Sequence, residues 1–207
     1  MTRSNKSIFA TASLLAMLLL PQFVQAANDA DKDGIPNAAE PVLGTDPKNA
    51  DTDGDGINDL EDKSPLFAEN PIQRAGIPKA FKLTGQVEDN ADPITKKTVG
   101  DHLELAVKNT SNQDMTNIAV YYTVKDLGTG KTEGYYKPLS GLVIKSGEST
   151  SLHFDETEHP NHFRDNPNSV YYKSTNEKLF TVELAAAGLA PVLIEIHKDA
   201  GGAEQPD

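Results

Sequence analysis

The sequence contains no cysteine among its 207 residues. No disulfide can therefore staple the fold, no cysteine can carry a lipid anchor, and a cysteine nucleophile is excluded. The sequence also lacks a G-x-S-x-G nucleophile elbow and a glycine-rich phosphate-binding loop. Stability must then come from a hydrophobic core or from bound metal. We predict that the protein is not an enzyme.

Basic residues are scarce relative to acidic ones, with 19 Lys and Arg against 31 Asp and Glu and a net charge of −12. The imbalance is concentrated in residues 27–64, where eleven acids face three bases and the net charge is −8. Such a charge balance argues against binding to nucleic acid and against charge-driven binding to anionic membranes. It favours a module that binds cations.

Long hydrophobic runs are also scarce, because only the segment from Ile8 to Leu20 is continuously apolar. Arg3 and Lys6 precede this run, and Val24 and Ala26 place aliphatic or small residues at the positions that a signal peptidase reads, which is typical of a secretory signal peptide. The run is too short to favour a retained membrane anchor. We therefore predict a signal peptide over residues 1–26 and a secreted or periplasmic product that is neither a lipoprotein nor inserted in a membrane.

Between Asp29 and Asp62 the chain repeats one acidic pattern, D-x-D-x-D-G-I, with copies starting 22 residues apart at Asp29 and Asp51. Carboxylates at positions 1, 3 and 5 repel one another unless a divalent cation lies among them. Glycine at position 6 permits the sharp turn, the position 7 carbonyl is a fourth donor, and an acid at position 12 closes the loop. The predicted calcium ligands are Asp29, Asp31, Asp33, the Ile35 carbonyl, Asn37 and Glu40 in the first loop, and Asp51, Asp53, Asp55, the Ile57 carbonyl, Asp59 and Asp62 in the second.

The two loops are expected to differ in quality. Lys32 places a cation inside the first loop, and Pro41 disfavours a helical conformation at Glu40. The second loop is therefore predicted to be the better site. The side chains of Ile35 and Ile57 are both expected to point inward and to supply the small core of the module. Calcium is expected to stabilise the fold rather than to act as a signal, and a purely soluble acidic linker is the alternative.

No amphipathic helix flanks either loop, which argues against complete EF-hands and against a dockerin-like module. The link Gly44-Thr45-Asp46-Pro47, followed by Asn49-Ala50-Asp51, resembles that of thrombospondin type 3 repeats in the form found in bacterial envelope proteins. The resemblance covers residues 29–62 only. It implies that Asp46 and Asn49 also help to bind calcium.

The remaining chain divides into three parts. Residues 65–79 contain Pro65, Pro71 and Pro78 and are predicted to be a semi-rigid linker. Residues 80–198 show apolar residues at every second position near 81–87, 103–107, 118–124, 152–154, 180–184 and 192–196. This pattern predicts a mainly β fold, namely an antiparallel sandwich of seven to nine strands that looks immunoglobulin-like. Residues 199–207 lack apolar anchors and are predicted to be disordered.

Three of the five histidines, His153, His159 and His162, lie within ten residues. They are candidate zinc or copper ligands, although neighbouring residues of a loop often face solvent in different directions. His102 and His197 are interpreted as ordinary strand residues.

The sequence thus predicts an exported calcium-binding adhesion or scaffold protein. In this interpretation the repeat rigidifies and spaces a β-sandwich that binds an unidentified envelope or extracellular protein or glycan. The alternative is a metal-dependent hydrolase that uses the histidine-rich loop.

Overall fold

The computed structural model describes residues 28–91, 95–157 and 159–203, so the predicted signal peptide lies outside the described residues. Within these ranges the chain is mainly β, with eight strands and two one-turn helices. The strands are β1 (Phe81–Gln86), β2 (Leu103–Asn109), β3 (Ala119–Asp126), β4 (Thr132–Pro138), β5 (Ser149–Asp155), β6 (His162–Arg164), β7 (Lys178–Ala186) and β8 (Leu189–Lys198). The helices are α1 (Glu40–Leu43) and α2 (Val170–Lys173).

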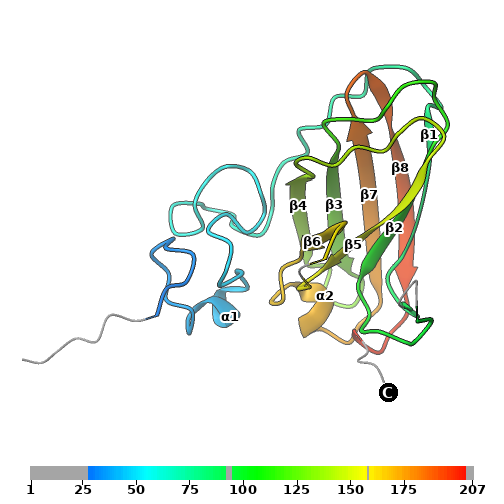
Figure 1. The fold of residues 1–207 in the computed structure, drawn as a ribbon. Helices are drawn as coiled ribbons and strands as arrows, with labels where there is room; N and C mark the ends of the chain where they lie inside the picture. Colours follow the sequence, from blue (N-terminus) through cyan, green and yellow to red (C-terminus); the bar gives the residue numbers. More distant parts are fainter. Residues whose placement is uncertain (1–27, 92–94, 158, 204–207) are drawn as a thin grey trace, which may run out of the picture.

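The strands form two four-stranded sheets in the orders β1-β2-β5-β6 and β4-β3-β7-β8, which face each other in Figure 1. Neighbouring strands are antiparallel, except that β6 pairs in parallel with β5. The prediction of a mainly β chain with largely antiparallel sheets is confirmed. The sequence pattern did not indicate β4 or β6, because β4 contains Gly134 and few aliphatic residues and β6 is only three residues long.

The core lies between the two sheets and is built from every second residue of the strands. Tyr122 of β3 pairs with Val182 of β7, and Leu105 of β2 pairs with Leu152 of β5. All four side chains are buried. Because fully burying a large apolar side chain contributes about 1.5–3 kcal/mol, the alternating pattern accounts for the register of both sheets.

The segment 65–79 packs on the sandwich instead of acting as a free connector. Phe67 forms a parallel bridge with Gly134 of β4, and the N–H of Ala68 donates to the Gly134 carbonyl at 3.0 Å. The hydroxyl of Tyr121, on β3, donates to the Ala68 carbonyl at 3.0 Å. The segment therefore covers the exposed edge of β4 and then passes over the outer side of β3.

The second half of this segment continues across the same sheet. The side chain of Asn70 donates to Glu183 of β7 at 2.7 Å, and Arg74 forms an ion pair with the same carboxylate at 3.2 Å. Farther on, Ile77 pairs with Leu189 of β8. The linker thus crosses all four strands in their order in the sheet, visible as the teal path in Figure 1. The segment predicted to be a semi-rigid linker is therefore held on the sheet by these contacts.

The end of the chain also departs from its prediction. The N–H of Gly201 donates to the Thr175 carbonyl at 3.0 Å, and Ala203 packs against the core. Residues 199–203 are therefore held by the sandwich, and residues 204–207 lie outside the described residues. In the part of the chain that the structure describes, neither helix has the length and apolar character that crossing a bilayer requires.

Candidate metal centre

The two acidic loops have the same backbone hydrogen bonds, position by position. In each loop the carboxylate at position 1 accepts the N–H groups of positions 4 and 6, which draws the chain into a tight turn. The donors to Asp29 are Lys32 at 2.8 Å and Gly34 at 3.2 Å, and the donors to Asp51 are Gly54 at 2.9 Å and Gly56 at 2.8 Å. Positions 4 and 6 have positive φ in both loops, which suits the three glycines and is uncommon for Lys32.

Position 9 closes each loop in the same way. The side-chain oxygen of Asn37 accepts the N–H of Ala30 at 2.8 Å, and Asp59 accepts the N–H of Thr52 at 2.8 Å. The Thr52 hydroxyl also donates to the second carboxylate oxygen of Asp59 at 2.6 Å. The predicted ligand Asn37 therefore uses its amide oxygen to hold the loop together.

A second group of carboxylates joins the two loops. Carboxylate oxygens of Asp33, Glu40 and Asp59 lie within 4.8 Å of one another, and all three residues are buried. Asp33 also belongs to a group with Asp29 and Asp31. Asp59, which is predicted as a ligand of the second loop, is held by Thr52 of that loop, but its carboxylate also lies beside acids of the first loop. This first centre therefore gathers acids from both copies of the repeat.

Several of these carboxylate oxygens are buried without a hydrogen-bond partner. In the described part of the chain, both oxygens of Glu40 and one oxygen each of Asp31, Asp33 and Asp53 accept no hydrogen bond. Burying an unpaired carboxylate costs several kcal/mol, so an arrangement of this kind needs a compensating positive charge. The donor set consists of oxygen atoms, which are the ligands that calcium prefers.

The electrostatics show the same need for a cation. Burial, together with the nearby charges of Asp31, Asp33, Asp46 and Asp59, raises the pKa of Glu40 to about 7. Burial likewise raises the pKa of Asp53 to about 7, with Asp55, Asp62 and Asp51 contributing. The pKa of Asp59 is also raised, chiefly by burial. A bound divalent ion would reverse these shifts by favouring the charged carboxylates.

The second centre is more open than the first. It gathers Asp51, Asp53 and Asp55, of which Asp55 is exposed. Asp62 accepts the N–H of Ser64 at 2.9 Å and lies near enough to raise the pKa of Asp53. By burial the first centre is the better enclosed of the two.

Two local features explain why neither Pro41 nor Lys32 disrupts the enclosed first centre. Pro41 lies in the first turn of α1, where a backbone N–H has no partner to lose, so Glu40 begins the helix. The side chain of Lys32 is exposed, so its ammonium group does not replace a metal ion.

The two isoleucines of the loops differ in burial. Ile35 is 6% exposed, as predicted, but Ile57 is 46% exposed, so the prediction of an inward side chain at Ile57 is wrong. The first loop is followed by a second loop, whereas no third acidic loop follows the second. The last copy of a stacked repeat has no neighbour to cover its apolar residue.

The two ligands implied by the resemblance have other partners. Both oxygens of Asp46 accept hydrogen bonds from Arg164 of β6, at 2.6 Å and 2.5 Å. Asn49 donates its side-chain N–H to the Asp51 carbonyl at 2.7 Å. Asp46 is 1% exposed and lies close enough to influence Glu40, but its carboxylate fastens the repeat to the sandwich. The carboxylate of Asp46 is therefore occupied by Arg164, whereas the amide oxygen of Asn49 takes no part in its hydrogen bond to Asp51.

The second loop contacts the edge of β4 directly. The N–H of Tyr136 donates to the Asp53 carbonyl at 2.7 Å, so the residue that carries a central carboxylate also pairs with the sheet. A side chain at Gly54 would place its Cβ only 1.9 Å from the Tyr136 carbonyl oxygen. Gly54 is therefore required for this close approach.

The first half of the repeat is fastened to the segment before α2. The side chain of Asn166 donates to the Gly44 carbonyl at 2.7 Å, and that of Asn168 donates to the Thr45 carbonyl at 2.7 Å. Figure 1 shows the repeat on the side of the sandwich where β4, β6 and α2 lie. The two acidic loops and the sandwich are thus joined by one continuous set of polar contacts.

The three candidate ligands His153, His159 and His162 do not form one group of metal-binding atoms among the described residues. His153 and His162 lie next to each other with stacked rings, but His159 is exposed and only touches His162 edge-on, at 5.6 Å between ring centroids. His153 instead groups with His102 and Glu104, which the sequence analysis did not assign. Neither residue is near His153 in the chain, so only strand pairing could reveal this group.

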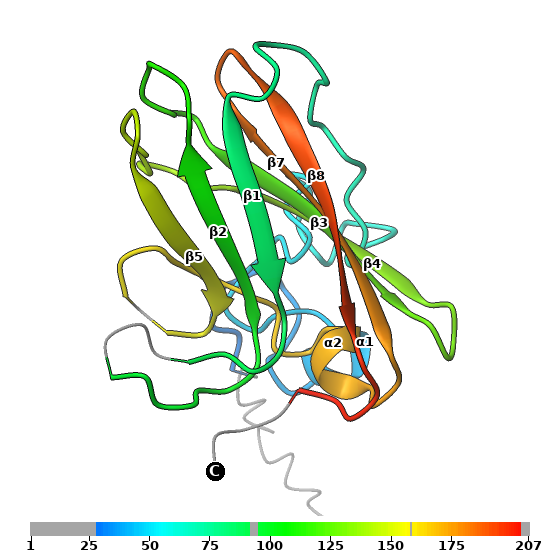
Figure 2. The ribbon, with the colours of Figure 1, turned by 90° about the vertical axis from the view of Figure 1, so that its right-hand side faces the viewer.

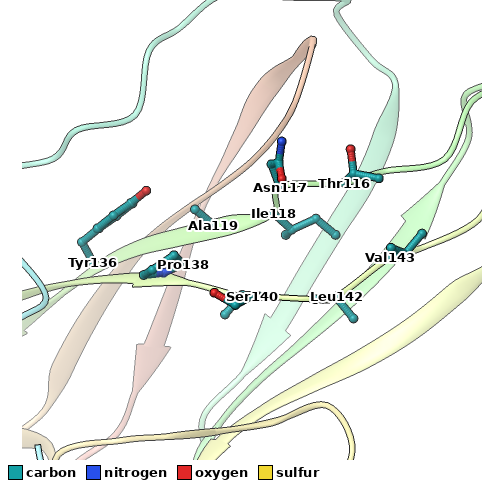
Figure 3. A pocket seen from close by; sticks show the side chains of 11 residues that line it. Thr116, Asn117, Ile118, Ala119, Tyr136, Pro138, Ser140, Leu142 and Val143 are labelled. Atoms are coloured by element: carbon teal, nitrogen blue, oxygen red, sulfur yellow. The ribbon is translucent and has the colours of Figure 1, made fainter.

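A shallow hollow of about 290 Å³ lies between the start of β3, the end of β4 and the loop that follows β4 (Figure 3). Tyr136, Pro138 and Ser140 line one side and Asn117 and Val143 line another. None of its lining residues is charged. The polar side chains that line it are those of Thr116, Asn117, Tyr136 and Ser140.

Comparisons with known proteins identify no family. No protein-family model matches the chain, and no curated protein matches it. Similar solved structures include a putative ApaA protein from Bordetella pertussis, at 11% identity and a TM-score of 0.33, covering 58% of this chain and 91% of that one.

Enzymes also occur among the similar structures. A β-glucuronidase from Bacteroides uniformis has 12% identity and a TM-score of 0.31 over 59% of this chain, and a β-glucosidase from Listeria innocua has 15% identity and a TM-score of 0.30 over 60%. The matched regions are only 13% and 16% of those enzymes. At these scores the likeness carries no argument about function.

Proposed function

We propose that this chain is a calcium-binding protein in which bound calcium holds a two-loop repeat in its fold and against a β-sandwich. The observation that carries the proposal is the set of buried carboxylate oxygens that accept no hydrogen bond in the described chain, above all both oxygens of Glu40. A buried carboxylate in such a site is stable only if it is protonated or bound to a cation.

Calcium fits these loops better than magnesium does. Calcium accepts six to eight oxygen ligands in flexible geometry, whereas magnesium demands near-ideal octahedral geometry and retains several waters. The carboxylates of Asp29, Asp31, Asp33, Glu40 and Asp59 would hold one ion, and those of Asp51, Asp53 and Asp55 another, with Asp62 nearby. We take the Ile35 and Ile57 carbonyls as further donors because they follow the carboxylates in each loop.

The role we propose for the ion is structural. The repeat contains one short helix, and Ile35 is its one buried isoleucine, so little apolar surface stabilises it. At a free ion concentration 100 times the Kd, binding would stabilise the folded state by roughly 2.7 kcal/mol per site, which is large for so small a segment.

We further propose that the sandwich is immunoglobulin-like and serves as an exported adhesion or scaffold domain. Its strand order supports this assignment, because β1, β2 and β5 correspond to strands A, B and E and β3, β7 and β8 to strands C, F and G of that fold. Such folds host many functions, and the partner would be an envelope or extracellular protein or glycan. The docked linker indicates that the repeat braces the sandwich rather than spacing it.

The rival hydrolase lacks geometric support. It requires His153, His159 and His162 to converge, and His159 lies outside the group that contains His153.

Calcium titration tests the proposal. Isothermal titration of chelator-treated protein is expected to show about two sites with Kd near 0.1–1 mM, the range of extracellular modules. Glu40→Gln should remove the first site and Asp53→Asn the second, because each removes a charged ligand from a buried group. The matched control is Glu61→Gln, which changes an exposed acid of the same segment and should leave both sites intact.

Absence of binding heat in the folded wild-type protein would refute the proposal. Equal weakening by all three variants would refute the assignment of residues, because it would indicate a general effect of negative charge. Limited proteolysis gives a second readout. Chelation is expected to expose residues 28–64 to cleavage while the sandwich persists.

A further inference from the structure

A row of side chains crosses three strands on the outer face of the sheet β1-β2-β5-β6. Glu104 of β2 pairs with His153 of β5, and His153 pairs with His162 of β6. Neighbouring core residues point to the other face, so this row lies away from the core. His102 and His153 are nevertheless buried, at 5% and 7% exposed. Strands β2 and β5 lie side by side in Figure 2, and His102, directly before β2, contacts His153 of β5.

His102 brings a second ring into this row. Its Nε2 lies 2.9 Å from Nδ1 of His153, and ligand atoms of His102, His153 and Glu104 all lie within 4.8 Å of one another. Two ring nitrogens that share a zinc ion, each at about 2.0–2.1 Å with tetrahedral angles, are separated by about 3.4 Å. Opening the existing pair by about 0.5 Å would therefore admit the ion.

The hydrogen bonds of His102 determine which of its two ring nitrogens carries the proton and which one faces His153. Nδ1 of His102 lies 2.7 Å from the Gly100 carbonyl, which can only accept, so this nitrogen carries the proton. Nε2 of neutral His102 is then a free lone pair that points at His153. A proton shift within the His153 ring, from Nδ1 to Nε2, would free the facing nitrogen as well. No proton has to leave the protein.

The surrounding residues hold the three groups in place, as the outer partners of metal ligands do. Asn90, which is 1% exposed, accepts the N–H of His102 at 3.2 Å and donates to Glu104 at 3.4 Å. The ring of His162 stacks on that of His153, with centroids 4.5 Å apart and an angle of 12° between the planes. Nδ1 of His162 is in turn held by Asp155 at 2.9 Å.

We propose that His102, His153 and Glu104 bind a divalent transition-metal ion, with zinc as the principal candidate and copper(II) as its competitor. Imidazole nitrogens favour zinc, copper and nickel, whereas calcium prefers oxygen. Two histidines and one carboxylate leave a coordination position for water or an exogenous ligand. This site is distinct in place and in metal class from the calcium loops.

The test uses the full chain without a histidine tag, stripped by chelation and then saturated with calcium so that the acidic loops are filled. Titration with zinc is expected to show one site. Cobalt(II) is expected to give the visible absorption of a four-coordinate ion, and zinc to abolish that absorption. The same titration with copper(II) measures the competitor.

Variants assign the site. His153→Gln is expected to weaken zinc binding more than about 100-fold, since loss of an outer partner alone costs about 10–100-fold. His159→Gln and His197→Gln are matched controls, because both residues are exposed histidines outside the group, and neither should change the affinity. If His153→Gln does not fold, Glu104→Gln, which keeps the shape of the side chain, takes its place.

Three results would overturn the proposal. Folded wild-type protein that takes up neither zinc nor cobalt would show that the two rings form a structural hydrogen bond only. Full zinc affinity in folded His153→Gln or Glu104→Gln would move the site elsewhere. Loss of affinity in His159→Gln would return the site to the loop that the sequence suggested.

Discussion

Raising the pH from about 4.5 to 7 is expected to destabilise the repeat when calcium is absent. The pKa of Glu40 is raised from 4.5 to about 7, and that of Asp53 from 3.8 to about 7, chiefly by burial. A carboxyl group with a raised pKa in the folded state contributes stability below its unfolded pKa and loses it as the pH rises through its folded pKa. In this window the unfolded chain releases both protons whereas the folded chain largely retains them, so the folded repeat is expected to lose several kcal/mol of stability.

Calcium is expected to reverse this dependence. The ion binds the ionised carboxylates, so protons compete with it and the affinity falls as the pH falls below 7. The calcium-loaded protein should therefore gain stability over the range in which the chelated protein loses it. Hydrogen exchange of residues 28–64, measured at several pH values with calcium and with a chelator, follows the repeat without interference from the sandwich.

The double variant Glu40→Gln with Asp53→Asn separates the two effects. Because neither amide ionises, the chelated variant should be more stable than chelated wild-type protein at pH 7, and its pH dependence should be weaker, with Asp59, whose pKa is also raised, contributing to what remains. Calcium should no longer stabilise it. The same pH slope with and without calcium in the wild-type protein would contradict the assignment of these two carboxylates.

Replacing Gly54 with alanine is expected to detach the second loop from the sandwich. Gly54 has φ of 85°, and an added Cβ would lie 1.9 Å from the Tyr136 carbonyl oxygen, which belongs to the backbone of β4. The clash would separate the Asp53 carbonyl from the Tyr136 N–H and so break a 2.7 Å hydrogen bond. A buried polar group left without a partner costs about 1–3 kcal/mol.

Gly56→Ala is the matched control, because Gly56 has φ of 94° and an added Cβ there would meet no atom within 4 Å. Both variants carry the backbone cost of about 1–2 kcal/mol for a left-handed alanine. Their difference in unfolding free energy, measured by urea denaturation in calcium, therefore isolates the contact with β4. We expect Gly54→Ala to be the less stable by about 1–3 kcal/mol. Equal stabilities would show that the contact contributes nothing.

Most strands of the sandwich could be predicted from alternating apolar residues in the sequence, because each strand buries one face in the core. The six apolar runs correspond to β1, β2, β3, β5, β7 and β8. Strand β4 was missed because its stability comes from its partners on both sides, β3 and the segment 65–79. A strand whose pairing is supplied by distant segments leaves little local signal.

The two acidic loops could be predicted from the sequence for a local reason as well. The carboxylates at positions 1, 3 and 5 and the glycine at position 6 are brought together by the turn itself. The hydrogen bonds of Asp29 and Asp51 to their own loops depend on neighbours within five residues. Residue types and spacing therefore determined which side chains can surround an ion.

Only the tertiary structure decided which loop shares which ligand and what the loops rest on. Asp59 joins Asp33 and Glu40 through the packing of one repeat on the other, and Asp46 is taken by Arg164 from a strand more than a hundred residues away. His102 reaches His153 by strand pairing. These contacts depend on distance in space, which the residue pattern of a single segment does not contain. The sequence by itself determined the loops and the sandwich, and folding determined how they are joined.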